Sequence, residues 1–361
     1  MASSMLSLAA AGIFLGSALA APTPAASQCS NYIVNATDNA WQFNHYKFLD
    51  FRSQSSSYSG SSDFTSQYRA QSWSNGKFAN QASNIAMTSD TINGVETNML
   101  SLYARHTGAQ VTAAELDSAD DDYYYASVRI GARVTGASGA CAGLFFYHDD
   151  TQETDIEILT REQGVHADAQ SQLQAGPTTA QLHFTNQPHW TATVDLSPST
   201  DNAVQGASWK DVNSYRIDWV PGMTYWWQNG IMSHTANKNM IQTPSSWIMN
   251  IWSNGDPTWS GAMAPNTEAR LDILWIEMVY NKFAEGQPKQ LPTSAYTGSC
   301  AVGAGDGTAL GQADSALTTA SKPQPATPAN APVATVTKYV TEPADGASWT
   351  VGRRAPMKYT A

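Results

Sequence analysis

Three acidic residues, Glu153, Asp155 and Glu157, alternate with Thr154 and Ile156 in the middle of the sequence. Apolar residues dominate the stretches before and after them, at 141–147 and 158–159, which is typical of a β-strand. Residues i, i+2 and i+4 of a strand point to the same face, so the pattern predicts that the three carboxyl groups share one face. Like charges raise one another's pKa, so we expect that face to line solvent or a wet functional site.

Two carboxyl groups on one surface, with a third between them, suit the hydrolysis of a glycosidic bond. One carboxylate attacks the sugar carbon while the other group protonates the leaving oxygen, and a retaining enzyme holds the two about 5–5.5 Å apart. On a flat strand the Cα atoms of Glu153 and Glu157 would be roughly 13 Å apart. We therefore expect the strand to curve or the side chains to lean inward. Asp155 could hold a proton between them and separate their pKa values.

Two other interpretations of the acidic run stay open. Alternating acids are ordinary on the solvent face of an antiparallel strand. The second is a metal cluster that includes His148, Asp149 and Asp150, although the sequence has neither EF-hand spacing nor a His/Cys zinc pattern. We expect no metal site and no cofactor.

Short alternating apolar runs, separated by turn residues, surround the acidic run and must position it. They lie at 123–134, 215–219, 224–227, 247–252 and 273–280, and Asn229-Gly230 is a strong hairpin signal. Convincing amphipathic helices are nearly absent. The sequence therefore predicts an all-β fold, a jelly roll or sandwich of two antiparallel sheets.

Tryptophan is abundant, with 12 residues in the chain. Core packing is the default role of each, but exposed aromatic rings also stack on the C–H faces of sugars. Trp252 and Trp259 flank the loop at 253–257 and are candidate ligand contacts. His183 and Asn186, on a short run nearby, could reach the same place.

The two ends of the chain have a different composition from the middle. Residues 1–20 resemble a secretory signal peptide, with an apolar stretch and an A-x-A cleavage site at Ala18-Leu19-Ala20. Residues 301–361 are rich in Ala, Thr and Pro and are expected to form a disordered tail. The predicted folded domain spans 27–300. We expect a secreted monomer with no membrane span.

Net charge and cysteine content narrow the partners and the compartment. The formal net charge of −11 argues against nucleic-acid binding. Of the 3 cysteines, Cys29 and Cys300 flank the predicted domain, and their pairing would join its ends. Cys141 reads as a small buried apolar residue. Asn35 begins the N-x-[ST] sequon, a candidate glycosylation site.

Four motifs in order resemble those of glycoside hydrolase family 16. They are ETDIE at 153–157, YRIDW at 215–219, WWQNG at 226–230 and MNIW at 249–252, and residues 41–52 are similar to fungal members in particular. The resemblance implies a concanavalin A-like β-jelly roll with a concave substrate cleft, and cleavage of β-glucan with retention. It implies that Glu153 is the nucleophile, Glu157 the general acid/base and Asp155 the assisting carboxylate. The expected substrate-binding residues are Trp252, Trp259, Asn250, Asn186 and Trp227.

The sequence departs from the family pattern at three positions. Thr154 stands where Ile or Leu is usual, on the face opposite the acids. Asn213 stands where many members have a His, which alters a possible substrate contact. Leu274 takes the place of an Asp that supports a structural calcium ion in many members, so calcium is doubtful here.

The leading functional prediction is a secreted endo-acting hydrolase of β-1,3 or mixed β-1,3/1,4-glucan. Its rival is a cell-wall glucan transglycosylase, which would use the same residues with a sugar as acceptor. A third possibility, from another class, is a non-catalytic glucan-binding wall protein.

Overall fold

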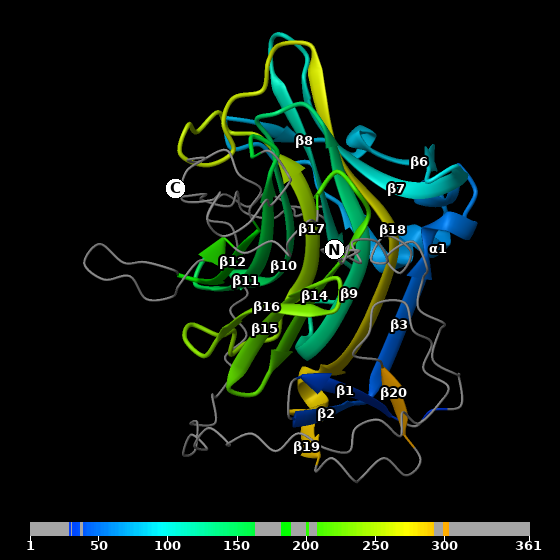
Figure 1. Cartoon of the computed structure of the whole chain (residues 1–361), viewed down its shortest axis with the longest axis vertical. Coiled ribbons are helices and arrows are strands. Elements are labelled where there is room, and N and C mark those ends of the chain that lie inside the picture. Colours follow the sequence, from blue (N-terminus) through cyan, green and yellow to red (C-terminus); the bar gives the residue numbers. More distant parts are fainter. Residues whose placement is uncertain are drawn as a thin grey trace, which may run out of the picture.

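Long antiparallel strands in two layers carry the acidic run (Figure 1). The computed structural model describes residues 29, 31–36, 39–162, 182–188, 200–201, 208–291 and 299–302. The predicted signal peptide, and the predicted tail from residue 303 onward, lie outside the described residues. Within those ranges no helix is long and apolar enough to cross a bilayer.

One layer, the acid sheet, contains the strand that bears the three acids. Its order is β13-β12-β11-β10-β17-β8, with β4 on the far edge of β8. The bounds are β4 (Tyr68–Ala70), β8 (Val111–Ser118), β10 (Cys141–Asp149), β11 (Gln152–Leu159), β12 (His183–Gln187), β13 (Thr200–Asp201) and β17 (Ser246–Trp252).

The other layer, the second sheet, has the order β6-β7-β18-β9-β14-β15-β16, and β3 pairs with the second half of β18. The bounds are β3 (His45–Asp50), β6 (Ile85–Ile92), β7 (Val95–His106), β9 (Tyr123–Gly136), β14 (Asn213–Val220), β15 (Met223–Gln228), β16 (Ile231–Ala236) and β18 (Thr267–Lys282). The two layers are hydrogen-bonded to each other where β7 pairs with β8, and β5 (Ala79–Asn80) pairs in parallel with β8. The predicted two-layer, mainly antiparallel fold is confirmed, with this connection added.

A large apolar core fills the space between the layers. Phe146 of β10 packs against Trp219 of β14 and Trp247 of β17, with ring centroids 5.6 and 5.0 Å apart. Ile156 and Ile158 of β11 enter the same core and are 1% and 0% exposed. Burial of each such side chain contributes roughly 1.5–3 kcal/mol. Because the apolar residues of β11 face this core, the acids that alternate with them must lie on the opposite face.

The remaining elements are short. The helices are α1 (Ser62–Gln67) and the 3-10 turns η1 (Phe51–Ser53), η2 (Tyr58–Gly60), η3 (Ala82–Asn84) and η4 (Phe283–Glu285). A small sheet at the lower end of Figure 1 has the order β19-β2-β1-β20, with β1 (Tyr32–Ala36), β2 (Asn39–Phe43), β19 (Lys289–Leu291) and β20 (Cys300–Val302).

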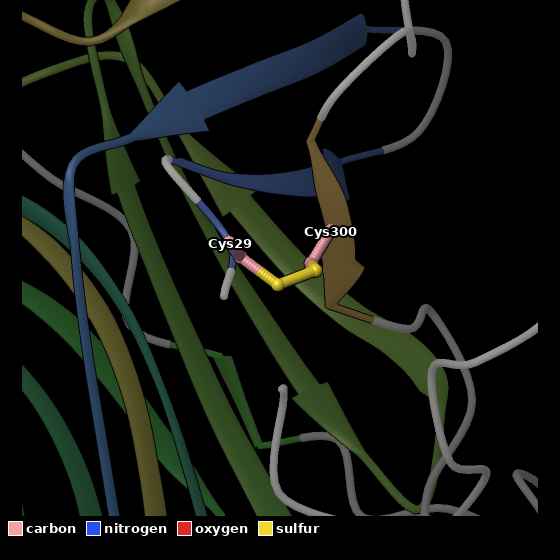
Figure 2. The surroundings of a disulfide bond; sticks show 2 residues. All are labelled: Cys29 and Cys300. Atoms are coloured by element: carbon pink, nitrogen blue, oxygen red, sulfur yellow. A yellow bond between two sulfur atoms is a disulfide. The ribbon is translucent and has the colours of Figure 1, made fainter. Parts of the chain in front are cut away.

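A disulfide between Cys29 and Cys300 joins the two ends of the described chain (Figure 2). Cys300 lies in β20, directly beside Tyr32 of β1. Arg216 of the second sheet donates to the carbonyl oxygen of Asn35, which ties the small sheet to β14. Glycosylation of Asn35 stays a prediction, and Thr37 of its sequon lies outside the described residues.

Replacing Cys29 and Cys300 together by serine is expected to lower the free energy of unfolding by about 2–5 kcal/mol, because the cross-link closes a very long loop. The sequence separation of the two cysteines is 271 residues. Thermal unfolding with and without reductant measures the effect. Reductant should lower the Tm of the wild type to that of the variant and leave the variant unchanged. Equal Tm values for oxidised wild type and variant would contradict this role.

Candidate active site

The three acids lie on the face of β11 that points away from the core. Thr154, Ile156 and Ile158 take the other face and are buried in the core region. On the acid face, β10 places Tyr147 opposite Glu153, Phe145 opposite Asp155 and Gly143 opposite Glu157. On the other side, β12 places Gln187, Thr185 and His183 opposite the same three acids. The row of carboxyl groups therefore runs along the middle of the acid sheet.

Asp155, the central acid, is the most enclosed of the three. It is 3% exposed, and Gln187 Nε2 lies 3.5 Å from its Oδ2. Desolvation raises the pKa of Asp155 well above its usual range, and the neighbouring negative charges of Glu153 and Glu157, together with a side-chain hydrogen bond to Glu153, raise it further. These causes favour the protonated form of Asp155, and its hydrogen bond to Glu153 is one of them.

Glu153 lies on the same face as Asp155, two residues before it. It lies half-buried at the start of β11, next to Tyr147 and Gln187 on the neighbouring strands. A protonated neighbour that donates a hydrogen bond stabilises the ionised form of a carboxyl group. Asp155 is therefore placed to assist Glu153 as a nucleophile, which must be ionised to attack.

Glu157 has the opposite tendency. Desolvation raises its pKa, while a hydrogen bond from Cys141, the charge of His183 and a hydrogen bond from Trp259 act to lower it. His183 lies opposite Glu157 on β12 and contacts Glu162, with 3.2 Å between Nε2 and Oε1. The net direction is upward, so Glu157 keeps its acid form to a higher pH than an ordinary glutamate, which is the direction that a general acid requires.

The loop between β17 and β18 places Trp259 beside Glu157. Trp259 Nε1 lies 3.3 Å from Glu157 Oε1, and its ring packs on His183 with centroids 4.7 Å apart. Asp256 accepts hydrogen bonds from the backbone and hydroxyl of Thr258, and Arg161 donates to the carbonyl oxygen of Pro257. Trp259 therefore lies beside the acids, and its role as a substrate contact stays a prediction.

A further acidic residue of the same face, Glu115, was missed by the sequence analysis. It lies on β8, is 1% exposed, and pairs in register with Asn250 of β17. Trp73 Nε1 donates to Glu115 Oε1 at 3.0 Å, and Asn250 Nδ2 donates to Oε2 at 3.2 Å. Glu115 thereby fixes the amide of Asn250, which lies two strands from Glu157. A single Glu within the apolar run at 111–118 was the available signal.

Aromatic side chains pack on this face beside the acids. Trp252 is 2% exposed, and Phe78 stacks on it with centroids 5.8 Å apart and an interplanar angle of 19°. Trp73 packs on Phe78 in turn. Trp252 therefore lies on the predicted face, but Phe78 covers its ring, so we assign it support of the face rather than direct stacking on a sugar.

Two predicted substrate-binding residues lie away from the acids. Asn186 pairs with Thr154, so it points to the opposite face of the acid sheet, where its Nδ2 donates to the carbonyl oxygen of Lys238 at 3.0 Å. Trp227 belongs to the second sheet, where its Nε1 donates to Asp218 at 2.9 Å and Arg216 lies over its ring. The structure brings neither residue to the acid face, which corrects both predictions.

Among the described residues, no group of three His, Cys, Asp or Glu side chains could hold a metal ion. His148 Nδ1 contacts the carbonyl of Pro244, and Asp149 and Asp150 accept hydrogen bonds from Thr151 and Tyr147 in the β10–β11 turn. Leu274, at the position of the possible calcium ligand, is 0% exposed and packs among apolar residues. The residues present at these two places do not fit a calcium ion.

Gly143 lies between Glu157 and Asn250 in the register of the acid sheet. A Cβ atom at Gly143 would come within 2.6 Å of Asn250 Oδ1 and 3.3 Å of the Phe145 ring. Replacement by valine is therefore expected to lower kcat/KM by about 10²-fold or more, because small displacements of reacting groups carry such costs. Initial rates of the variant and the wild type on the same soluble substrate measure the effect.

Gly60 offers a matched control, since a Cβ atom there would meet nothing within 4 Å. The Gly60→Val variant should keep the wild-type rate. Wild-type activity in Gly143→Val would contradict the expectation that the space at Gly143 is needed for activity.

The known proteins whose sequences are similar to part of this chain are β-glucanases. No family model matches the chain. A β-glucanase of Paenibacillus macerans is 30% identical over 73 residues, which is 20% of this chain and 31% of that protein. One of Brevibacillus brevis is 24% identical over 174 residues, 44% of this chain and 56% of that protein. The chain thus spans about a third to just over half of the length of these curated relatives.

Solved structures of similar proteins include the β-glucanase of Bacillus licheniformis, with a TM-score of 0.49 and 19% identity over 66% of this chain and 98% of that one. A glycoside hydrolase family 16 endo-glucanase from Bacteroides ovatus has a TM-score of 0.46 and 13% identity over 64% of this chain and 99% of that one. The predicted resemblance is confirmed at the level of sequence: the chain is similar to β-glucanases over part of their length.

Proposed function

We propose that this protein is a retaining glycoside hydrolase of family 16 that cleaves internal β-1,3 or mixed β-1,3/1,4 linkages of β-glucan. The observation that carries the proposal is the row of three carboxyl groups on the outer face of β11, with Glu153 and Glu157 on either side of Asp155. Burial raises the pKa of Asp155 and of Glu157, and Asp155 has a side-chain hydrogen bond with Glu153. The similarity to β-glucanases supports the choice of substrate.

The reaction divides into two displacements at one sugar carbon. Glu153 attacks the anomeric carbon, the bond from that carbon to the glycosidic oxygen breaks, and Glu157 gives its proton to that oxygen. Water then attacks the same carbon, Glu157 takes a proton from the water, and the bond to Glu153 breaks. Asp155 keeps its proton throughout and holds the carboxyl of Glu153 in place.

The protein is proposed to act outside the cell as a monomer. The signal peptide predicted at 1–20 and the Cys29–Cys300 disulfide support secretion, since disulfides persist in oxidising compartments. A place in the cell wall, and glycosylation of Asn35, belong to the same proposal.

Product analysis on lichenan, laminarin and curdlan, beside a Glu153→Gln control, tests the function. New reducing ends that vanish in the control, with the β-anomer formed first in proton NMR spectra, are expected. Products longer than the starting oligosaccharides, with few new reducing ends, would assign sugar rather than water as acceptor. Binding to a glucan without any product would overturn the catalytic proposal in favour of a binding protein.

A further inference from the structure

Glu157 is held at one of its two carboxyl oxygens. The thiol of Cys141 donates to Oε1 at a distance of 3.2 Å, and Trp259 Nε1 donates to the same oxygen at 3.3 Å. The two donors come from different elements, β10 and the loop after β17. An oxygen that accepts two hydrogen bonds is a poor place for a proton, which would face two donor hydrogens.

We propose that Cys141 and Trp259 are positioning residues that keep the proton of Glu157 on Oε2, and so select the oxygen that serves the glycosidic bond. This inference rests on the proposed role of Glu157 as acid and base. In each turnover the proton would leave Oε2 for the glycosidic oxygen as the carbon–oxygen bond breaks. It would return to Oε2 from the water that attacks the glycosyl-enzyme.

The register of β10 and β11 places Cys141 for this role. Cys141 pairs with Leu159, and Gly143 pairs with Glu157, so the thiol lies diagonally across from the carboxyl group on the same face. Diagonal neighbours on paired strands lie within reach of longer side chains.

The thiol stays protonated and can therefore donate. Cys141 is 0% exposed, and burial raises the pKa of its thiol well above the usual range, with a further rise from the negative charge of Glu157. Because Cys29 and Cys300 are joined, Cys141 is the remaining thiol of a chain with 3 cysteines.

Other groups also face Glu157 and must be separated from the effect of Cys141. Asp155 lies two residues away on the same strand, and His183 faces Glu157 from β12 with Glu162 behind it. These groups would be unchanged in a Cys141 variant. A change in the proton affinity of Glu157 on removal of the thiol would thus report the thiol itself.

The pH dependence of kcat/KM tests the inference. Cys141→Val and Trp259→Phe each remove one donor to the carboxylate, so each should move the upper limb of the profile to higher pH by about half a unit to one unit. Cys141→Ser keeps a donor and should retain the wild-type limb. Ile158→Val, on the core face of β11, is the matched control and should leave the limb unchanged.

A second readout does not depend on activity. The S–H stretching band in the infrared spectrum belongs to Cys141 alone. At a pH above the upper limb of the profile, where Glu157 is ionised, the band should move to higher frequency in Glu157→Gln, because a neutral amide accepts more weakly than a carboxylate. The inference would be overturned by an S–H band that does not move in Glu157→Gln. It would also be overturned if the upper limb of the pH profile lay at the same pH in Cys141→Val and Ile158→Val. A wild type inactive on every glucan would instead refute the proposed function, while the infrared result still tests the contact.

Discussion

Replacing Glu153 by glutamine is expected to reduce the hydrolysis of β-glucan by about 10⁴-fold or more. No carboxylate would remain at position 153 to attack the anomeric carbon, and the loss of a covalent nucleophile has effects of this size. The measured quantity is kcat/KM on lichenan or laminarin, from the release of reducing ends.

The fold of the Glu153→Gln variant should be intact. Glutamine has nearly the same volume, and loss of the negative charge at 153 removes one cause of the raised pKa of Asp155. A carboxyl group whose pKa is raised by folding destabilises the folded state above its unfolded pKa. The free energy of unfolding at neutral pH should therefore stay equal or rise.

Glu96→Gln, at an exposed position of β7, is the matched control for a lost acidic charge. It should keep wild-type activity and Tm. More than a tenth of wild-type activity in Glu153→Gln, measured on a preparation whose mass confirms glutamine at residue 153, would contradict the nucleophile assignment.

Replacing Glu157 by glutamine is expected to lower kcat/KM on β-glucan by about 10²–10⁴-fold, the usual contribution of a general acid or base. The loss should depend on the leaving group. A glycosidic oxygen of a sugar needs a proton to leave, whereas a dinitrophenolate does not. The rate of the first displacement with a dinitrophenyl β-glycoside should therefore fall far less than the rate with the polysaccharide.

The pH profile should change with the same variant. Burial raises the pKa of Glu157, so the wild type should keep its acid form, and its activity, to a higher pH than an ordinary glutamate would allow. In Glu157→Gln this upper limb should disappear. Azide should speed the second displacement, because it attacks without a general base, and should yield a β-glycosyl azide. Equal losses with both leaving groups would contradict the acid/base assignment.

Much of the fold could be predicted from local patterns. The runs at 123–134, 215–219 and 247–252 correspond to β9, β14 and β17, and the hairpin at Asn229-Gly230 joins β15 to β16 with positive φ at both residues. These patterns are local, since they follow from period-2 alternation and turn residues. The pairing of distant segments is not local, so the small sheet and the β7–β8 connection had no signal in the sequence.

The wrong site predictions have the same origin. In the pair Trp226-Trp227, alternation sends one ring into the core and the other to the opposite face of the second sheet. The sequence does not say which sheet the pair belongs to. Asn186 could be placed only with the register between β11 and β12, since a shift of one residue exchanges the faces.

For Cys141, the local sequence predicted the burial of the side chain but not its contact with Glu157. The sequence predicts a small buried apolar residue, and the side chain is indeed buried. Its contact with Glu157 depends on the register of β10 against β11, which brings residues 16 positions apart within hydrogen-bond distance. The residues next to Cys141 in the sequence give no indication of that contact.

The most direct test of the central claim is to trap the glycosyl-enzyme. The enzyme is incubated with a dinitrophenyl 2-deoxy-2-fluoro-β-glycoside of a short glucan oligosaccharide. The fluorine should slow both displacements and let the intermediate accumulate. Peptide mass spectrometry then identifies the labelled residue. The account predicts one added glycosyl group per chain, attached to Glu153, and no label in Glu153→Gln. A label on Glu157, or no label while the enzyme releases the α-anomer from β-glucan, would contradict it.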